Sequence, residues 1–132
     1  MAANKRVLIV EDEFLIRSFL EYIIRDLGYS LGASVGTLTE AQQCASAGNF
    51  DLAIVDFHLH GKSALPVIEA LAAQQTPFIV TTGNGLKSVE LPAGASALLL
   101  KKPYGIEVLT EALNSVGITG SQSRKLDEPP QS

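Results

Sequence analysis

Leu52-Ala53-Ile54-Val55-Asp56 is the most informative segment of this chain, because four apolar residues follow one another and the run then ends on a carboxylate. Such a short, unbroken apolar run predicts a strand buried on both faces, as in a parallel sheet covered by helices. The run from Arg6 to Val10 has a similar form and is followed by Glu11 and Asp12. Both segments therefore predict interior strands whose carboxyl ends carry acidic groups.

After these strands, the apolar residues recur at the spacing of an α-helix instead of forming an unbroken run. From Phe14 to Leu27 apolar residues recur at helical spacing, and Gly28 predicts the end of that helix. The alternation continues, with further strands predicted over 31–35, 78–82 and 97–101 and further helices over 39–47, 63–74 and 105–116. Glycine and proline limit any helix over 86–91 to a turn or two, so we expect that unit to be short and mobile.

Strands that alternate with helices predict parallel pairing, because each return to a parallel neighbour needs a long crossover over one face of the sheet. The predicted fold is a three-layer α/β sandwich around a five-stranded parallel sheet. The 132 residues support one domain, which we predict over residues 1–119. Residues 120–132 are mostly polar and include two prolines, so we expect them to form a disordered tail.

Composition restricts the classes of partner and compartment. The net charge of −4 argues against general binding to nucleic acid, which depends on clustered lysine and arginine. No apolar run approaches the roughly 20 residues of a membrane-spanning helix, and the first residues lack a secretory signal. We therefore expect a cytoplasmic protein. Cys44 is the one cysteine and cannot form a disulfide within the chain.

Polar residues at the strand ends are expected to meet at one edge of the sheet. Every strand of a parallel sheet delivers its carboxyl end to the same side, where ligands bind. The residues delivered there are Glu11, Asp12, Asp56, Thr81, Thr82, Lys101 and Lys102. Two carboxylates 4 Å apart repel by about 4 kcal/mol at an effective dielectric of roughly 20. A lysine and a hard divalent cation such as Mg²⁺ would offset that repulsion.

Asp56 is suited to a second role at such a site. One of its oxygens can hold the metal while the other attacks phosphorus, which gives an acyl phosphate. Lysine and metal would then neutralise the equatorial oxygens of the phosphoryl group, so that catalysis is mostly positioning and charge. The pattern therefore predicts a site that takes up a phosphoryl group with the help of Mg²⁺.

Residues 5–117 resemble a response-regulator receiver domain of two-component signalling in both spacing and residue type. The resemblance implies a flavodoxin-like sheet with its strands in the order 2-1-3-4-5. It places the phosphoacceptor at Asp56 and the hydroxyl that senses the phosphoryl group at Thr82. It also assigns Lys102, which precedes Pro103 as in the family, to the catalytic set.

The same resemblance implies metal ligands and partners. Asp12, Asp56 and the backbone carbonyl of His58 would ligate Mg²⁺, with Glu11 helping directly or through water. The phosphodonor would be a histidine kinase or a histidine phosphotransfer protein. The phosphoryl group would bias residues 83–96 between two arrangements, and another protein would bind one of them better. The chain would be a monomer, or dimerise on phosphorylation, and would catalyse at most its own phosphorylation and dephosphorylation.

The chain departs from the usual receiver pattern at two places. Residues 57–63 lack the proline that often follows the acceptor, so we expect a different loop geometry. Leu99 stands where an aromatic switch residue is usual, which puts the usual aromatic rotamer switch in doubt. Residues 77–83 are similar to part of the strand-four signature of the FATGUY receivers, a stand-alone type that also lacks this aromatic.

Other functions are weighed beside this one. A Mg²⁺-dependent phosphohydrolase would attack small phosphate esters through Asp56, with His58 where such enzymes usually place a second acid. A degenerate receiver would act by docking alone, although the site residues argue against it. A zinc site at His58 and His60 is disfavoured because no third ligand is in register. Ser63 is predicted to cap a helix instead of binding phosphate.

Overall fold

A computed structural model describes residues 5–83, 91–92, 95–119 and 124–125 of the chain. Strands and helices alternate along it much as the sequence predicts. The elements are β1 (Arg6–Val10), α1 (Phe14–Asp26), β2 (Ser30–Val35), α2 (Leu38–Ala47), β3 (Leu52–Asp56), β4 (His58–Leu59), β5 (Lys62–Ser63), α3 (Leu65–Ala73), β6 (Phe78–Thr82), β7 (Ala97–Lys101), α4 (Ile106–Thr119) and β8 (Arg124–Lys125).

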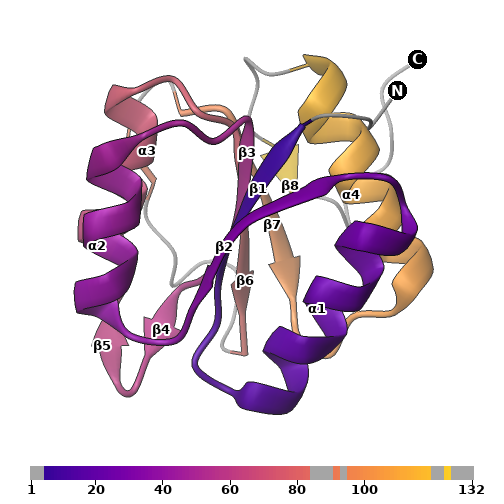
Figure 1. Ribbon diagram of the computed structural model, residues 1–132, viewed down its shortest axis with the longest axis horizontal. Helices are drawn as coiled ribbons and strands as arrows, with labels where there is room; N and C mark the ends of the chain where they lie inside the picture. The colour runs from indigo at the N-terminus through magenta and orange to yellow at the C-terminus, as the bar shows by residue number, and fades with distance from the viewer. Residues whose placement is uncertain (1–4, 84–90, 93–94, 120–123, 126–132) are drawn as a thin grey trace.

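The main sheet is parallel, and its order confirms the flavodoxin-like prediction (Figure 1). β2, β1, β3, β6 and β7 lie side by side in that order, which is 2-1-3-4-5 when the five long strands are numbered along the chain. β8 pairs with β7 as a sixth parallel strand that the sequence analysis did not predict. β4 and β5 pair with each other in a separate antiparallel hairpin.

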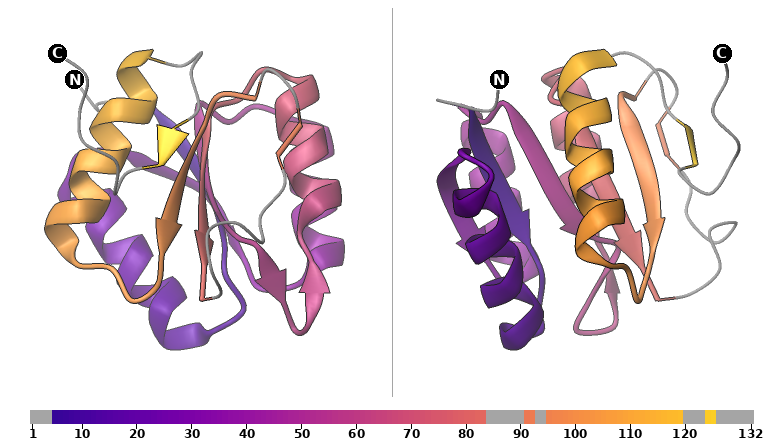
Figure 2. Two further views of the ribbon diagram at one scale, coloured as in Figure 1. Left: turned by 180° about the vertical axis from the view of Figure 1, so that it is seen from behind. Right: turned by 90° about the vertical axis from the view of Figure 1, so that its right-hand side faces the viewer.

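Helices cover both faces of this sheet, which confirms the three-layer sandwich. α2 and α3 lie on one face, and α1 and α4 lie on the other (Figure 1, Figure 2). The carboxyl ends of β3, β6 and β7 point to the same edge of the sheet, beside the β4–β5 hairpin (Figure 1). This edge carries the residues proposed for the site.

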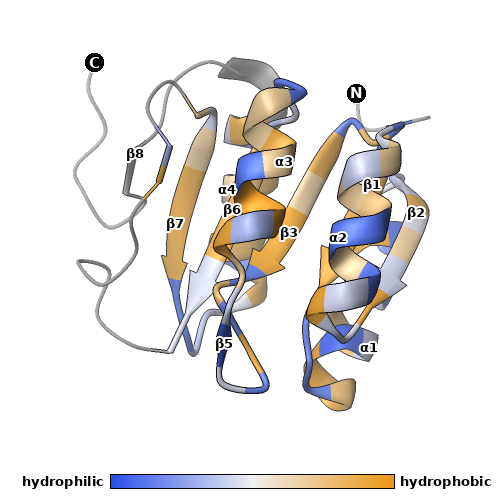
Figure 3. Cartoon of the chain, turned by 90° about the vertical axis from the view of Figure 1, so that its left-hand side faces the viewer, coloured by the Kyte–Doolittle hydropathy of each residue, from blue (hydrophilic) through white to orange (hydrophobic). Residues whose placement is uncertain are grey.

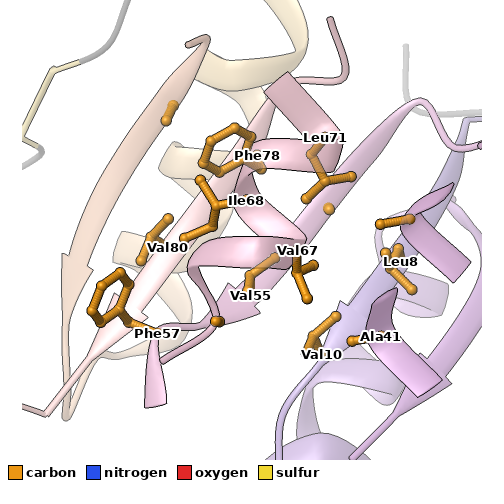
Figure 4. Packing of buried hydrophobic residues seen from close by; sticks show 14 of the residues in the cluster. Leu8, Val10, Ala41, Val55, Phe57, Val67, Ile68, Leu71, Phe78 and Val80 are labelled. Atoms are coloured by element: carbon orange, nitrogen blue, oxygen red, sulfur yellow. The ribbon is translucent and has the colours of Figure 1, made fainter. Parts of the chain in front are cut away.

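Alternate residues of each strand divide the core into two clusters. Val55 and Val80 face α2 and α3, where they share a cluster with Ile68 (Figure 4). On each strand, the residues that alternate with these pack toward α1 and α4. They include Ile9, Ile54, Ile79 and Leu98. β3 and β7 are accordingly hydrophobic along most of their length (Figure 3). Burial of both faces explains why these strands read as unbroken apolar runs.

α1 buries a narrower face than its apolar residues suggest. The buried positions of this helix are Leu20, Ile23 and Ile24. Phe14 is 68% exposed, Leu15 80% and Tyr22 65%, although all three are apolar or aromatic. The first turn of α1 lies at the edge of the sheet where the strands end (Figure 1), which leaves it little sheet to cover. The helical spacing of apolar residues in the sequence does not show that these three side chains are exposed.

Two predicted segments fall largely outside the described residues. Of the short helix expected over 86–91, the structure describes Leu91 alone, so that prediction is not tested. Of the tail expected over 120–132, the structure describes Arg124–Lys125 (β8) alone, so the prediction of disorder is not tested either. Over the described ranges, no helix combines the length and the hydrophobicity needed to cross a membrane.

Candidate functional site

Four strands bring the predicted residues to one edge. Glu11 and Asp12 directly follow β1, Asp56 ends β3, Thr82 ends β6, and Lys102 directly follows β7. The backbone N–H of Lys102 donates to the carbonyl of Thr82 at 2.8 Å, so β6 and β7 stay paired up to the site. Strand order therefore gathers groups that are far apart in sequence, such as Glu11 and Lys102, which are separated by 91 positions.

The side chain of Lys102 joins two of the acids. Its Nζ donates to Glu11 Oε1 at 2.9 Å and to Asp56 Oδ2 at 3.1 Å. Glu11 is 1% exposed and Asp56 is 5% exposed, so both carboxyls are removed from bulk water. Burying a charged group is costly unless it is paired, and here one ammonium serves two carboxyls.

The three carboxyls form a compact cluster. Glu11, Asp12 and Asp56 each offer an oxygen, and these oxygens all lie within 4.8 Å of one another. With the ammonium of Lys102 counted against three carboxylates, one positive and three negative charges leave a formal charge of −2. Oxygen donors, short separations and excess negative charge fit a hard divalent cation such as Mg²⁺. The side chains predicted to bind metal are therefore together.

Burial controls the acidity of the two carboxyls that Lys102 contacts. It raises the pKa of Glu11 from 4.5 to about 7, and the hydrogen bond from Lys102 opposes it in part. Burial also raises the pKa of Asp56, against the charge of Lys102. Burial favours neutral Lys102, but its hydrogen bond to Glu11 and the charge of Asp56 outweigh this effect, so its pKa is raised. Without a bound cation, Glu11 is partly protonated near neutral pH.

The β4–β5 hairpin contributes two backbone contacts to the site. The N–H of His60 donates to Asp12 Oδ2 at 2.8 Å, and the N–H of His58 donates to Asp56 Oδ1 at 3.3 Å. Burial opposes the charged form of Asp12, but hydrogen bonds led by that of the His60 N–H outweigh it and lower its pKa. Asp12 is therefore charged at neutral pH beside a partly protonated Glu11.

The loop that lacks a proline after the acceptor forms this hairpin. Its two-residue turn has His60 at φ 49° and Gly61 at φ 78°, and positive φ at both positions is typical of a type I′ turn. Ser63 lies in β5, where its hydroxyl accepts a hydrogen bond from the N–H of Leu65 at 3.1 Å. Ser63 thus contacts the start of α3 as predicted, although Ala64 occupies the N-cap position.

The two histidines do not assemble a transition-metal site. His60 Nδ1 is 3.8 Å from Asp12 Oδ2, and the ring of His58 packs edge-on against Phe57 with centroids 5.0 Å apart. In the part of the chain that the structure describes, the group suited to a metal is the acidic cluster, which includes neither histidine. The zinc alternative therefore has no support. The carbonyl of His58 as a Mg²⁺ ligand stays a prediction.

Tyr104 belongs to this region and was missed by the sequence analysis. Its hydroxyl is buried without a hydrogen-bond partner among the described residues. Burial, reinforced by the negative charge of Glu11, raises the pKa of Tyr104 to about 12. Tyr104 lines a groove of about 380 Å³ together with Glu13, Ile16, Phe19, Lys102 and Pro103. An aromatic residue directly after the Lys-Pro pair at a strand end was the available signal.

Comparison with known families agrees with this geometry. A model of the response regulator receiver domain matches residues 7–114, a range that contains every predicted site residue. The chain belongs to the response-regulator receiver domains. As a receiver domain it is a signalling module of two-component systems and not an enzyme that turns over a substrate. Receiver domains typically bind Mg²⁺ in an acidic site, and this chain has an acidic cluster of three carboxyls.

Relatives of different lengths share the receiver domain. The chemotaxis protein CheY of Pseudomonas aeruginosa is 24% identical and matches over 84% of this chain and 94% of its own length. The two-component response regulator PhoP of the same organism is 35% identical over 84% of this chain but 51% of its own length. The chain therefore spans nearly all of CheY and about half of PhoP.

Solved receiver structures match the fold. SdrG from Sphingomonas melonis Fr1 is 34% identical with a TM-score of 0.72, and the match covers 88% of this chain and 98% of SdrG. A BeF3-activated conformation of SdrG matches with a TM-score of 0.69 over 89% and 100% of the two chains. The receiver domain of sensor histidine kinase PA1611 from Pseudomonas aeruginosa PAO1, 25% identical with a TM-score of 0.72 over 86% and 97%, has a magnesium ion in its active site cleft.

Proposed function

We propose that this receiver accepts a phosphoryl group on Asp56 from a phosphohistidine, with Mg²⁺ bound by the acidic cluster. The observation that carries the proposal is the environment of the Asp56 carboxylate. Its Oδ1 accepts a hydrogen bond from the His58 N–H, and its Oδ2 accepts one from Lys102 Nζ. A carboxylate fixed at both oxygens is held in one orientation, which favours its action as a nucleophile.

The proposed transfer is a substitution at phosphorus. A carboxylate oxygen of Asp56 forms the new P–O bond while the P–N bond of the donor phosphohistidine breaks. The electron pair of the broken bond returns to the donor imidazole, which takes up a proton. When bound, Mg²⁺ supplies positive charge to the phosphoryl oxygens, and Lys102 supplies a second positive charge from beside the acceptor.

Phosphorylation is expected to change the contacts of Lys102. In the unmodified site its ammonium is shared between Glu11 and Asp56. A phosphoryl group adds roughly two negative charges, so Lys102 moves toward it and away from Glu11. Thr82 is fully buried at the end of β6, one residue beyond the Asp56–Thr81 pair, and we assign its hydroxyl to a phosphoryl oxygen.

The surface around the acceptor supports a protein as the phosphodonor. Phe14 and Leu15 expose apolar surface on the first turn of α1, and Ile106 at the start of α4 is 52% exposed. The groove that Lys102 and Tyr104 line adjoins the acceptor, because Lys102 itself contacts Asp56. An apolar rim of this kind fits a helix that presents a phosphohistidine. We therefore assign the donor to a histidine kinase or a histidine phosphotransfer protein.

The geometry favours phosphotransfer signalling over the other functions. In a phosphohydrolase that attacks phosphate esters through Asp56, His58 would act as the second acid, but its ring packs against Phe57. A docking-only receiver has no need for a lysine paired with two buried carboxyls, whereas a phosphoacceptor site does. Both observations support Asp56 as a functional acceptor.

We further infer a stand-alone cytoplasmic regulator that passes its signal to another protein. The match over 94% of CheY supports a role for a receiver without an attached output domain. The similarity of residues 77–83 to the FATGUY signature supports the same assignment. On this proposal, the chain is a monomer or a dimer that forms on phosphorylation, and its site acts on its own acyl phosphate alone.

The experiment is to incubate the chain with Mg²⁺ and acetyl phosphate and to weigh the intact protein. Wild type is expected to gain the mass of one phosphoryl group, and Asp56→Asn is expected to gain none. Asp51→Asn is the matched control, because Asp51 lies just before β3 and its carboxylate accepts from the Arg6 N–H. Equal phosphorylation of Asp56→Asn and wild type would overturn the proposal, and steady turnover of a generic ester through Asp56 would favour the phosphohydrolase.

A further inference from the structure

The side chain of Arg17 reaches from α1 to the main chain just after β1. Its Nη1 donates to the carbonyl oxygen of Glu11 at 2.8 Å, and the side chain is half-buried. The ring of Phe14 lies against the guanidinium, with its centroid 5.7 Å from Cζ. A hydrogen bond from a charged donor is stronger than one between neutral groups. The contact therefore holds the peptide group that joins Glu11 to Asp12.

Gly36 leaves the space that the guanidinium occupies. It directly follows β2, whose last residue, Val35, lies opposite Val10 in β1. A Cβ added at Gly36 would lie 2.6 Å from Nη1 of Arg17 and 3.5 Å from the carbonyl oxygen of Glu11. Gly36 has no positive φ, so its backbone conformation accepts alanine. The missing side chain at position 36 thus makes room for the hydrogen bond between Arg17 and Glu11.

Every polar group of Glu11 has a partner in this arrangement. Its N–H donates to the carbonyl of Val35 at 3.0 Å, and its Oε2 accepts from the N–H of Glu13 at 3.1 Å. Its Oε1 accepts from Lys102 at 2.9 Å, and its carbonyl oxygen accepts from Arg17. Arg17 therefore completes the set of contacts that hold Glu11 in place.

We propose that Arg17 is a positioning residue for Mg²⁺ binding, which acts through the main chain between Glu11 and Asp12. If the peptide group that Arg17 holds rotates, the carboxylate of Asp12 turns relative to that of Glu11, and the spacing of the acidic cluster changes. Groups that orient metal ligands without contacting the metal commonly change its affinity by about tenfold or more. The inference rests on the proposed binding of Mg²⁺ by the acidic cluster.

Charge and position predict opposite effects when Arg17 is replaced. The guanidinium is positive and contacts a residue of the acidic cluster, so removal of its charge alone would favour a divalent cation. Removal of its hydrogen bond would disfavour the same cation, because Asp12 would lose its orientation. Weaker Mg²⁺ binding in Arg17→Met therefore reports position. Gly36→Ala is expected to displace the guanidinium while the charge of the chain stays the same.

The first test is a calorimetric titration of Mg²⁺ into the full chain, at a temperature where wild type and all variants are folded. Arg17→Met and Gly36→Ala are each expected to bind Mg²⁺ about tenfold more weakly than wild type. The double variant is expected to bind like Arg17→Met, because without the guanidinium the added methyl group has nothing to displace. Arg17→Lys keeps a donor on a similar stem and is expected to bind more tightly than Arg17→Met.

The control for this titration is Arg25→Met, at an exposed position near the end of the same helix, which is expected to match wild type. Wild-type affinity in Arg17→Met overturns the proposal. If the losses of Arg17→Met and Gly36→Ala add up in the double variant, the two changes do not act through one contact, and the proposal is overturned as well.

The second test needs no metal. Without Mg²⁺, the amides of Glu11 and Glu13 are expected to exchange roughly two- to tenfold faster in Arg17→Met than in wild type, the range that one hydrogen bond supports. The amide of Ile54, inside β3, reports in the same NMR sample that the sheet is intact. A wild type that binds no Mg²⁺ would overturn the proposed metal site itself. A wild type that binds Mg²⁺, with equal exchange in the two proteins, would overturn only the role of Arg17.

Discussion

At the scale of single residues, Lys102 dominates the electrostatics of the unmodified site. Its ammonium is the partner of two carboxyls that are 1% and 5% exposed. Even with Lys102 in place, burial holds the pKa of Glu11 and of Asp56 above their ordinary values. The stability of the unmodified protein therefore depends on this lysine and on the protonation of its partners.

Replacement of Lys102 by methionine tests this dependence. Lys102→Met is expected to lower the free energy of unfolding by about 3 kcal/mol near neutral pH without Mg²⁺, because it leaves buried carboxylates unpaired. Acidification to about pH 5 is expected to restore part of the loss, since the carboxyls then become neutral. Urea unfolding measures both effects. Lys101→Met is the control at an exposed neighbour, and equal stability of the two variants at neutral pH would contradict the prediction.

Glu11 predicts the pH dependence of the protein without metal. Its pKa is about 7 in the folded chain against an ordinary 4.5, so between these values the folded state binds more protons than the unfolded state. The free energy of unfolding should therefore fall as pH rises from about 5 to about 7.5. Glu11→Gln does not titrate and is expected to flatten this slope in urea unfolding.

The same proton competes with the metal at this site. Mg²⁺ binds a carboxylate more readily than a carboxylic acid, so its affinity should rise with pH up to about 7, by at most roughly tenfold for each pH unit. A titration of Mg²⁺ at several pH values measures this. Affinity that is constant across the range in wild type would show that Glu11 does not affect the binding of the metal.

At the scale of elements, the β4–β5 hairpin is the segment that sequence patterns described least well. Its turn needs positive φ at His60 and Gly61, which the short His-Gly step permits but does not require. The contacts it makes with Asp12 and Asp56 are backbone N–H groups, and residue types alone do not encode them. The long strands were easier to predict from the sequence, because burial on both faces leaves an unbroken apolar run.

Replacement of Gly61 by alanine tests the hairpin. Gly61 has a φ of 78°, where a side chain is strained, so Gly61→Ala is expected to lower the free energy of unfolding by about 1 kcal/mol. It should also weaken Mg²⁺ binding, because the His60 N–H that contacts Asp12 belongs to the same turn.

The control for this change is Gly83→Ala. Gly83 has no positive φ, and an added Cβ there meets nothing within 4 Å. Thermal unfolding and a Mg²⁺ titration compare the two variants. If Gly61→Ala and Gly83→Ala lose equal stability and bind Mg²⁺ equally well, the hairpin has no role in placing Asp12.

At the scale of the whole molecule, the site exists because the topology delivers distant segments to one edge. Parallel pairing could be predicted from the alternation of strands and helices, and it brought Glu11, Asp12, Asp56 and Lys102 together. The exposed face of α1 and the strand β8 could not be predicted from the sequence, since both depend on where the sheet ends in space. Tyr104 was missed because its burial results from packing against α1 and its neighbours.

Binding of Mg²⁺ is expected to stabilise the whole fold. A ligand that binds the folded state alone raises the melting temperature as its concentration exceeds its dissociation constant. Millimolar Mg²⁺ should therefore raise the melting temperature of wild type, and Asp12→Ala should lose most of that rise. Asp51→Asn, remote from the cluster, should keep it. An unchanged melting curve across the wild-type titration would count against the metal site.

The hairpin also joins the acidic ends of β1 and β3, two strands that already pair directly in the sheet. The N–H groups of His58 and His60 are two positions apart, and each anchors the carboxylate of a different strand. One inserted residue would turn one of these groups away, whereas a changed side chain outside the positive-φ turn at His60 and Gly61 would leave both in place. The length of this segment and the glycine at position 61 are thus what the site requires of these few residues, and loop grafts that keep both should preserve the contacts with Asp12 and Asp56.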